Sequence, residues 1–368
     1  MNSIIKDLER LVKIDSRYGN ENNSTETFKS LLIKAGFAVK SQKLADGRVN
    51  LYAVKNPHNY GRALLFYGHQ DTVDIADDWS YEPRALTIKE NKAYGLGAFD
   101  MKGGIMAFLA ASTHSSAYIK IFLAVDEENI SEGGWHAVQT NRTFFEDVAL
   151  VISAEPSLTD GSTAITVGRT GRFLFDVTFK GKSAHLANYK DGIDAIERLH
   201  RFLGSFYAQR EQLFDAQGST AQIRSIQSEV IGMSVPELAS CQAEVLANVK
   251  QSIEVVERLL QKLAGKNGTV SLTPRKTPYL PGYSNETFEW QHPVEKTIRE
   301  VYGKPIRYIE RRSVGDDNVL ASIGLPVITW GPEGGNAHSA DEWVDLGSLE
   351  KLTSGYKKLL QLLESQAN

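Results

Sequence analysis

The chain has 368 residues, which is long for a single core, so its length predicts two domains. Hydrophobic residues make up 42% and charged residues 23%, close to the globular average, which argues against a disordered or fibrous chain. Lys and Arg number 41 against 45 Asp and Glu. The resulting net charge of −4 does not indicate the excess of positive charge that is typical of proteins binding nucleic acid or an anionic membrane. We therefore expect a small-molecule substrate, no nucleic-acid partner and no membrane partner.

The cysteine content and the N-terminal sequence indicate the cellular compartment in which we expect the protein. The single cysteine, Cys241, cannot form an intramolecular disulfide, so nothing indicates an oxidising compartment. Residues 1–10 alternate apolar and charged side chains at helical spacing, without the apolar stretch and cleavage site of a signal peptide. No apolar run approaches the roughly 18 residues that a membrane-spanning helix needs. We expect a cytoplasmic protein.

The first part of the chain alternates predicted helices with short apolar strands. Apolar spacing predicts a helix over residues 4–14, and a capping-box pattern at Asn23 and Glu26 predicts a second helix that ends at Gly36. This alternation predicts an α/β fold with a central, mostly parallel sheet covered by helices. The predicted strands are 50–55, 62–67, 119–125 and 149–153, and the predicted helices among them are 102–113 and 132–140.

From about Gly168 the pattern changes to strand, helix, two strands, helix, strand. This β-α-β-β-α-β order is typical of the ferredoxin-like unit, so residues 169–276 are predicted to form an inserted α+β domain. Residues 1–168 and 277–368 are predicted to form the other domain. The predicted elements of the insertion are strands 172–180, 221–229, 239–249 and 269–273 with helices 191–207 and 253–264, and those after it are helix 292–302, strands 307–310 and 326–330, and a helix from about Gly347.

Five potential metal ligands stand at or just beyond predicted strands and in loops. Two imidazoles and three carboxylates suit one or two divalent ions such as zinc, with cobalt or manganese as substitutes. Glu127 is a neighbouring carboxylate that could accept a proton from water, and Asp71 could hold the second nitrogen of a ligating imidazole. The five candidate ligands are His69, Asp100, Glu128, Glu155 and His338.

Taken singly, each of these residues has an ordinary structural explanation, such as a turn or a solvated loop. The run Asp126-Glu127-Glu128 argues for a cation, because three adjacent carboxylates at a buried strand end would repel one another without one. His338 follows the predicted insertion. If all five residues bind metal, residues 277–368 must therefore fold back onto residues 1–168.

The sequence resembles the M20 metallopeptidase family, which includes acetylornithine deacetylase, succinyl-diaminopimelate desuccinylase, aminoacylase-1 and the glutamate carboxypeptidases. The resemblance implies a zinc-hydrolase domain interrupted by a ferredoxin-like dimerisation domain. It further implies that His69, Asp100 and Glu155 hold one zinc ion, and that Asp100, Glu128 and His338 hold another. Glu127 would be the general base, and Asp71 would orient His69. The motifs that carry the resemblance are Gly68-His69-Gln70-Asp71, Asp100-Met101-Lys102-Gly103-Gly104, Glu127-Glu128, Glu155-Pro156 and His338 with Glu342.

The resemblance also implies a homodimer in which the inserted domain lends a histidine to the opposite subunit's active site. His185, at the end of Gly181-Lys182-Ser183-Ala184-His185, matches that position, where it could donate to a developing oxyanion. Its structural alternative is a surface histidine in a turn after a strand.

The residues that would bind substrate depart from the family pattern. Arg169 stands where many relatives have an Arg pair, and Asn248-Val249-Lys250 replaces an acidic-x-Arg sequence. Arg169 is the candidate for binding a substrate carboxylate, with Asn248 as a second substrate-binding candidate. The sequence leaves Arg172, Arg311 and Arg312 as competitors for the same role.

The candidate site together with the resemblance implies a zinc-dependent amidohydrolase that cleaves the amide bond of an N-acyl amino acid, such as an acetylated or succinylated one, because several small-substrate relatives share this compact length. A dipeptidase or a glutamate carboxypeptidase acting on a short peptide is the alternative that shares the same site. A catalytically inactive, metal-stabilised binding protein is the alternative of another class. The presence of Glu127 argues against that last alternative, because loss of the base would be its signature.

Overall fold

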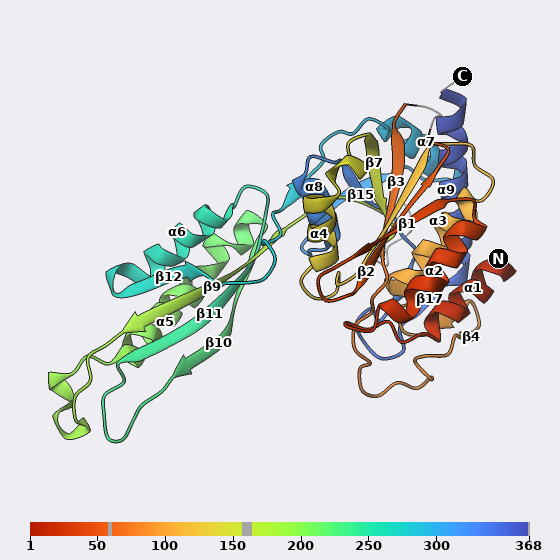
Figure 1. The fold of residues 1–368 in the computed structure, drawn as a ribbon. Helices are drawn as coiled ribbons and strands as arrows, with labels where there is room; N and C mark the ends of the chain where they lie inside the picture. The colour runs from red at the N-terminus through yellow and green to blue at the C-terminus, as the bar shows by residue number, and fades with distance from the viewer. Residues whose placement is uncertain (58–60, 157–163, 367–368) are drawn as a thin grey trace. The chain divides into compact units, whose positions relative to one another are not determined.

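The computed structural model describes residues 1–57, 61–156 and 164–366, and it divides into two compact units (Figure 1). The larger unit contains Met1–Gly168, Asn285–Ile309 and Gly315–Asn368. The smaller unit contains Arg169–Ser284 and Glu310–Val314. Residues 277–284 and 310–314, which the sequence analysis assigned to the larger domain, thus cluster with the smaller unit.

The larger unit is built on a mixed sheet whose four central strands are parallel. These four strands, β6, β3, β7 and β15, confirm the predicted α/β class with a mostly parallel centre. Every residue of β3, β6 and β7 is buried, as expected for strands covered by helices on both faces. The strands in spatial order are β1 (Ala38–Lys43), β2 (Val49–Lys55), β6 (Ile119–Ala124), β3 (Ala63–His69), β7 (Val148–Ser153), β15 (Val327–Thr329) and β8 (Ala164–Arg169).

Helices cover the two faces of this sheet. In Figure 1, α4 and α8 lie on one side, and α1, α3 and α9 lie on the other. The predicted helix α4 has the observed bounds, whereas α8 was not predicted from the sequence. The bounds of the helices are α1 (Asn2–Val12), α2 (Asn22–Lys34), α3 (Gly103–Ser112), α4 (Glu132–Thr140), α7 (Gln291–Tyr302), α8 (Asp316–Ser322) and α9 (Leu346–Gln366).

The first two helices show what apolar spacing predicts well and what it does not. Helix α1 buries Ile4, Leu8, Leu11 and Val12, the stripe that its sequence predicts. The capping box predicted at Asn23 is wrong, because α2 begins at Asn22 after Glu21 and has no side-chain cap. The helix ends as predicted before Gly36, whose φ of +90° is the left-handed conformation that favours glycine.

Residues that follow the inserted unit in sequence complete the core of the larger unit. Strand β15 pairs in parallel with β7, through Val327 and Val151. From α9, the Tyr356 ring packs 5.0 Å from the Trp330 ring and 5.1 Å from the Phe66 ring of β3. The C-terminal segment therefore folds onto the N-terminal part, as the position of His338 requires.

A second, small antiparallel sheet in the larger unit was not predicted. Its strand order is β16-β17-β5-β4, and it pairs Trp343 with Tyr94 and Val344 with Ala93. This sheet brings the chain around residue 340 next to the chain around residue 95. Its strands are β4 (Thr87–Lys89), β5 (Lys92–Tyr94), β16 (Gly334–Gly335) and β17 (Trp343–Asp345).

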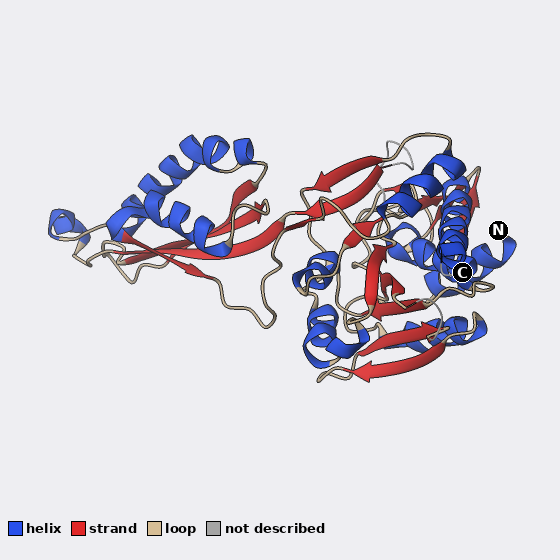
Figure 2. Cartoon of the chain, turned by 90° about the horizontal axis from the view of Figure 1, so that it is seen from above, coloured by secondary structure: helices blue, strands red, loops and turns tan. Residues whose placement is uncertain are grey.

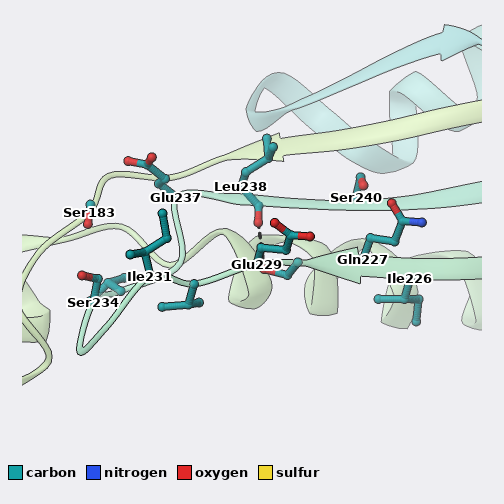
Figure 3. A pocket seen from close by; sticks show the side chains of 12 residues that line it. Ser183, Ile226, Gln227, Glu229, Ile231, Ser234, Glu237, Leu238 and Ser240 are labelled. Atoms are coloured by element: carbon teal, nitrogen blue, oxygen red, sulfur yellow. Dashed lines mark hydrogen bonds between the residues drawn. The ribbon is translucent and has the colours of Figure 1, made fainter.

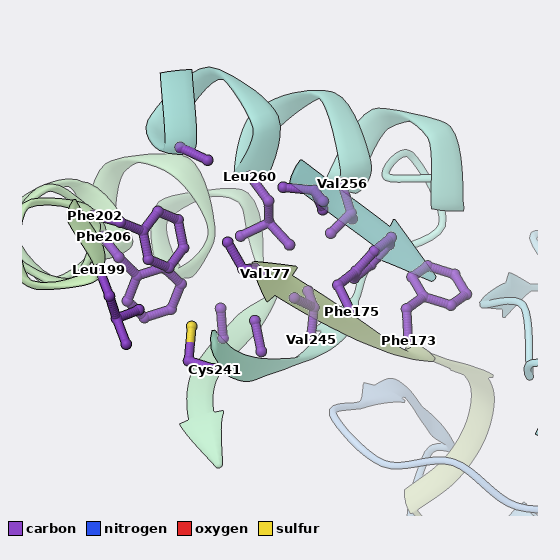
Figure 4. Close-up of a cluster of buried hydrophobic side chains, with 14 of the residues drawn as sticks. Phe173, Phe175, Val177, Leu199, Phe202, Phe206, Cys241, Val245, Val256 and Leu260 are labelled. Atoms are coloured by element: carbon purple, nitrogen blue, oxygen red, sulfur yellow. The ribbon is translucent and has the colours of Figure 1, made fainter. Parts of the chain in front are cut away.

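The smaller unit has the predicted ferredoxin-like order of elements. Its antiparallel sheet has the order β10-β11-β9-β12, and both helices lie on one face of the sheet (Figure 2). The core between helices and sheet contains Phe175, Val177, Phe202 and Leu260 (Figure 4). The elements are β9 (Gly171–Lys180), α5 (Ala195–Leu213), β10 (Thr220–Ser228), β11 (Leu238–Ala247), α6 (Ile253–Ala264) and β12 (Gly268–Leu272).

Helix α5 begins four residues later than predicted. A short 3-10 helix, Leu186–Asp191, ends where the helix was predicted to begin, and Asp194 caps α5 by accepting a hydrogen bond from the backbone N–H of Ile196 at 2.7 Å. Among the residues that the structure describes, no helix combines the length and the apolar character needed to cross a membrane.

Candidate metal centre

The candidate site lies at the carboxyl ends of the central parallel strands. His69 is the last residue of β3, Glu127 and Glu128 follow the end of β6, and Glu155 follows the end of β7. The carboxyl ends of parallel strands meet at one edge of a sheet, where open α/β sheets bind their ligands. The fold thereby gathers candidate side chains from three segments of the chain that are far apart in sequence.

Asp100 and His338 reach the same edge from loops outside the main sheet. Asp100 lies in a tight turn, Ala98–Lys102, that leads into α3; its own backbone is not helical, and its peptide bond to Met101 is cis. His338 lies in the loop after β16, where Asn336, His338 and Asp341 all have φ near +60°. A left-handed backbone conformation at a non-glycine residue is unfavourable in conformational free energy, and it is typical of functional loops. The Asn336 amide stabilises this loop by donating to the carbonyl oxygens of Ala340 and Asp341.

The Asp100 carboxylate lies between the two histidines. Its Oδ1 is 3.2 Å from Nε2 of His69, and its Oδ2 is 3.3 Å from Nε2 of His338. Nε2 of His69 is also 3.5 Å from Glu155 Oε1, and Nε2 of His338 is 3.0 Å from Glu128 Oε2. The structure thus brings the five predicted ligands together around the Asp100 carboxylate, and this set of nitrogen and oxygen atoms could hold one or two divalent cations.

The residues fit a divalent cation. Oxygen and nitrogen atoms of His69, Asp100 and Glu128 lie within 4.8 Å of one another, and so do those of His69, Glu127 and Glu155. The second group contains Glu127, so proximity alone does not separate the predicted base from the predicted ligands. Among the described residues, Oε1 of Glu128 is buried without a hydrogen-bond partner. A cation would satisfy such an oxygen and offset the cost of gathering several carboxylates.

The site contains both attractive and repulsive charge contacts, which shift the pKa values of its groups in different directions. Hydrogen bonds to Asp100 and Glu128 raise the pKa of His338 to about 11. Burial opposes ionisation of Asp100, but hydrogen bonds from His338 and His69 hold its pKa below the ordinary value. Burial and the neighbouring Glu155 raise the pKa of Glu127 well above its usual range. A metal ion entering this site would have to displace protons from the histidines, since only neutral imidazole ligates.

Asp71 contacts both His69 and the Glu128 loop. Nδ1 of His69 lies 3.0 Å from the backbone oxygen of Asp71 and 3.6 Å from its carboxylate Oδ1, so the carbonyl, and not the predicted carboxylate, is the nearer partner. Oδ2 of Asp71 accepts a hydrogen bond from the Glu128 backbone N–H at 3.0 Å. A proton on Nδ1 leaves Nε2 of His69 directed at Asp100 and Glu155 as an available ligand atom.

Three neighbours of the site were not assigned a role from the sequence. The Asp316 backbone N–H donates to Oε1 of Glu127 at 3.3 Å, and its carboxylate accepts from the hydroxyl of Tyr67 at 2.9 Å. Arg48 is buried and contacts Asp126, the residue before Glu127. Glu342 contacts the Asp100 turn. Glu342, as part of the His338 motif, carried a signal in the sequence, and so did Asp316, which ends the run Val314-Gly315-Asp316 where relatives have Thr-Ser-Asp.

The remaining predicted site residues lie in the smaller unit, at opposite ends of one strand pair. Arg169 precedes β9 and Asn248 follows β11, at the end where Gly171 pairs with Ala247. His185 follows the opposite end of β9. Because β9 has 10 residues and a strand rises about 3.3 Å per residue, the two ends of the strand lie roughly 30 Å apart. Within one chain, His185 therefore does not join the end of the sheet that carries Arg169 and Asn248.

The local contacts of these three residues differ. His185 is exposed, and its Nδ1 accepts a hydrogen bond from the Ala187 backbone N–H at 3.1 Å. Arg169 is buried and donates from Nη1 to Oγ of Ser313 at 2.8 Å. The side chain of Asn248 donates to the backbone oxygen of Gln217.

Comparisons with known proteins agree with this fold and site. Residues 65–362 match peptidase family M20/M25/M40. A succinyl-diaminopimelate desuccinylase from Orientia tsutsugamushi is 26% identical over 389 aligned positions, which cover 98% of this chain and 96% of that protein. A tripeptidase from Staphylococcus aureus has a similar structure, with a TM-score of 0.81 at 21% identity over 99% of this chain and 98% of that one. A dinuclear metal-binding M20 peptidase from Bacillus subtilis has a TM-score of 0.74 at 14% identity, over 99% and 98% of the two chains.

Together, the α/β fold, the gathered histidines and carboxylates, and these relatives define a metallohydrolase that acts on amide bonds. The match to the peptidase family covers residues 65–362, which is most of the chain. The protein belongs to peptidase family M20/M25/M40.

Proposed function

We propose that the protein is a zinc-dependent amidohydrolase that removes the acyl group from an N-acyl amino acid, as a deacetylase or desuccinylase does. The observation that carries the proposal is the Asp100 carboxylate set between His69 and His338, with Glu127 beside it. The desuccinylase relative, which aligns over nearly the whole chain, supports an acyl group as the part removed.

The residues divide into a metal-holding set and a proton-transferring residue. His69, Asp100 and Glu155 would hold one zinc ion, and Asp100, Glu128 and His338 would hold the other. Bound zinc supplies a Lewis acid that activates water and polarises a carbonyl. The Glu127 carboxylate accepts the proton of the attacking water and returns it to the nitrogen of the leaving amine.

Substrate binding and oxyanion stabilisation are assigned to the smaller unit. In this proposal, Arg169 binds the substrate carboxylate, Asn248 provides a second polar contact, and His185 donates to the developing oxyanion. Because β9 separates His185 from Arg169 by about 30 Å, the two residues can serve a single substrate only if they come from different chains. The proposal therefore includes a homodimer.

The surface near His185 supports a contact between two chains. Strand β10 is an edge strand, and large apolar side chains are exposed on and after it, including Ile226, Ile231 and Leu238. These three residues and Ser183 line a hollow of about 760 Å³ (Figure 3). An unpaired strand edge with exposed apolar groups is a common protein interface.

A substrate panel tests the proposed activity. Purified, zinc-loaded protein would be incubated with N-acetyl and N-succinyl amino acids and with dipeptides, and the released amine would be measured. We expect a higher kcat/KM for an N-acyl amino acid, and turnover lowered about 10²–10⁴-fold in the Glu127→Ala variant. A preference for dipeptides would replace the acyl assignment with the dipeptidase alternative. Zinc binding without any turnover would favour the inactive binding protein.

A further inference from the structure

The carboxylate of Glu342 is bonded to the backbone of the turn that carries Asp100. Its Oε2 accepts a hydrogen bond from the N–H of Gly97 at 2.9 Å, and its Oε1 accepts from the N–H groups of Phe99 and Asp100, each at 2.9 Å. The Glu342 side chain is 1% exposed. Hydrogen bonds are electrostatically stronger in a buried place than in water, so these three bonds hold the backbone of the turn in one conformation.

Glu342 also lies in the segment that carries His338. It follows His338 by four residues and directly precedes β17, which pairs with β5. The backbone oxygen of Glu342 accepts a hydrogen bond from the N–H of Gly95 at 3.0 Å. One residue therefore links the His338 loop to the Asp100 turn through both its backbone and its side chain.

We propose that Glu342 is a positioning residue that fixes Asp100 and His338 relative to each other, so that a single carboxylate faces both histidines. The proposal rests on the proposed function in one respect, namely that Asp100 and His338 are metal ligands. The His338 loop contains left-handed backbone at non-glycine residues, and it needs an anchor to keep that conformation. The contacts of Glu342 supply that anchor directly at the amide of Asp100.

A neighbouring carboxylate offers a matched control. Asp345 lies three residues after Glu342, and it accepts hydrogen bonds from the side-chain amide of Asn91 at 2.9 Å and from the Ser348 N–H at 2.7 Å. Neither of these two contacts involves a predicted ligand. Asp345→Asn therefore removes a carboxylate from the same segment without touching the Asp100 turn.

The test compares Glu342→Gln with Asp345→Asn and the wild type. The readouts are the Kd for Co²⁺ from chelator competition, the visible absorption spectrum of bound Co²⁺, and thermal unfolding of the metal-free proteins. Gln keeps the shape of Glu but cannot accept hydrogen bonds at both terminal atoms. We expect Glu342→Gln to weaken Co²⁺ binding about 10–100-fold and to change the spectrum, as losses of residues that orient ligands typically do. Asp345→Asn should bind Co²⁺ with the wild-type Kd and spectrum.

Wild-type affinity and spectrum in Glu342→Gln would overturn the inference while leaving the proposed function intact. A wild-type protein that binds no metal would instead overturn the proposed function and this inference with it. If Glu342→Gln does not fold, hydrogen exchange in the metal-free wild type decides the matter. Slow exchange of the Gly97, Phe99 and Asp100 amides is expected without metal, and fast exchange would show that Glu342 does not hold the turn.

Discussion

Nε2 of His338 lies 3.3 Å from Oδ2 of Asp100, although the two residues are separated in sequence by the whole smaller unit. The contact exists because β15 pairs with β7 and β17 pairs with β5, which return the C-terminal segment to the N-terminal part of the larger unit. The candidate metal centre is therefore complete only when residues from both ends of the chain have folded together.

Removing either histidine should lower metal binding. His69→Ala and His338→Ala each delete an imidazole that faces Asp100. Loss of a residue that only supports a ligand typically weakens metal binding about 10–100-fold, so we expect loss of a ligand itself to lower the affinity for zinc at least that much. Equilibrium dialysis against zinc followed by elemental analysis measures the change. An unchanged zinc content in His338→Ala would show that the C-terminal loop does not contribute a ligand.

Removing the proposed base should separate catalysis from metal binding. Glu127→Ala should reduce turnover by about 10²–10⁴-fold, the usual contribution of a general base, while leaving zinc content close to that of the wild type. Activity and elemental analysis on the same preparation give both quantities. Loss of zinc in this variant would make Glu127 a ligand, in agreement with its place beside His69 and Glu155.

Arg48 should stabilise the fold around the site. Its guanidinium lies 3.0 Å from Asp126 Oδ1 and 3.1 Å from Glu21 Oε1, and both carboxylates are fully buried. Arg48→Met would leave these carboxylates buried without their cation, and breaking a buried pair in this way costs about 3–5 kcal/mol. Urea unfolding measures the loss. Arg201→Met, which removes an exposed pair with Glu197, serves as a control and should change stability little.

The loss of folding stability caused by Arg48→Met should become smaller at low pH. Burial raises the pKa of Glu21 and of Asp126 above their ordinary values. A carboxyl group whose pKa is higher in the folded than in the unfolded state binds protons on folding. It therefore destabilises the folded state at a pH above its folded-state pKa, and this destabilisation decreases as the pH falls through that value. Without Arg48 both groups should protonate more readily. The difference from the wild type should therefore shrink as the pH is lowered, and a difference that grows in acid would contradict this explanation.

Subunit mixing tests the proposed role of His185. A His185→Ala chain mixed with a Glu127→Ala chain should regain activity that neither has alone, because one site of the mixed dimer would contain both Glu127 and His185. Activity after confirmed subunit exchange is the measurement. A mixture no more active than its components would remove His185 from the partner's active site.

The sequence predicted the parts of this structure that have a periodic or positional signal. Helices α4 and α6 have the predicted bounds, and in α6 the buried residues Val256, Leu260 and Ala264 recur at helical spacing. His69 and Glu155 were found because they end or follow apolar strands. The strands β16 and β17 have two and three residues, too few to show a period. The contacts of Arg48 with Glu21 and Asp126 join distant positions, which no local pattern reveals.

The most direct test of the account is the number of zinc ions that each chain binds, measured by elemental analysis after equilibrium dialysis, in the wild type and in Asp100→Asn. The Asp100 carboxylate faces both histidines, so we predict a pair of zinc ions per wild-type chain and a loss of affinity for both in the variant. A wild type that binds no zinc, or an Asp100→Asn variant that binds it equally well, would contradict the proposal of a metal pair held by a shared carboxylate.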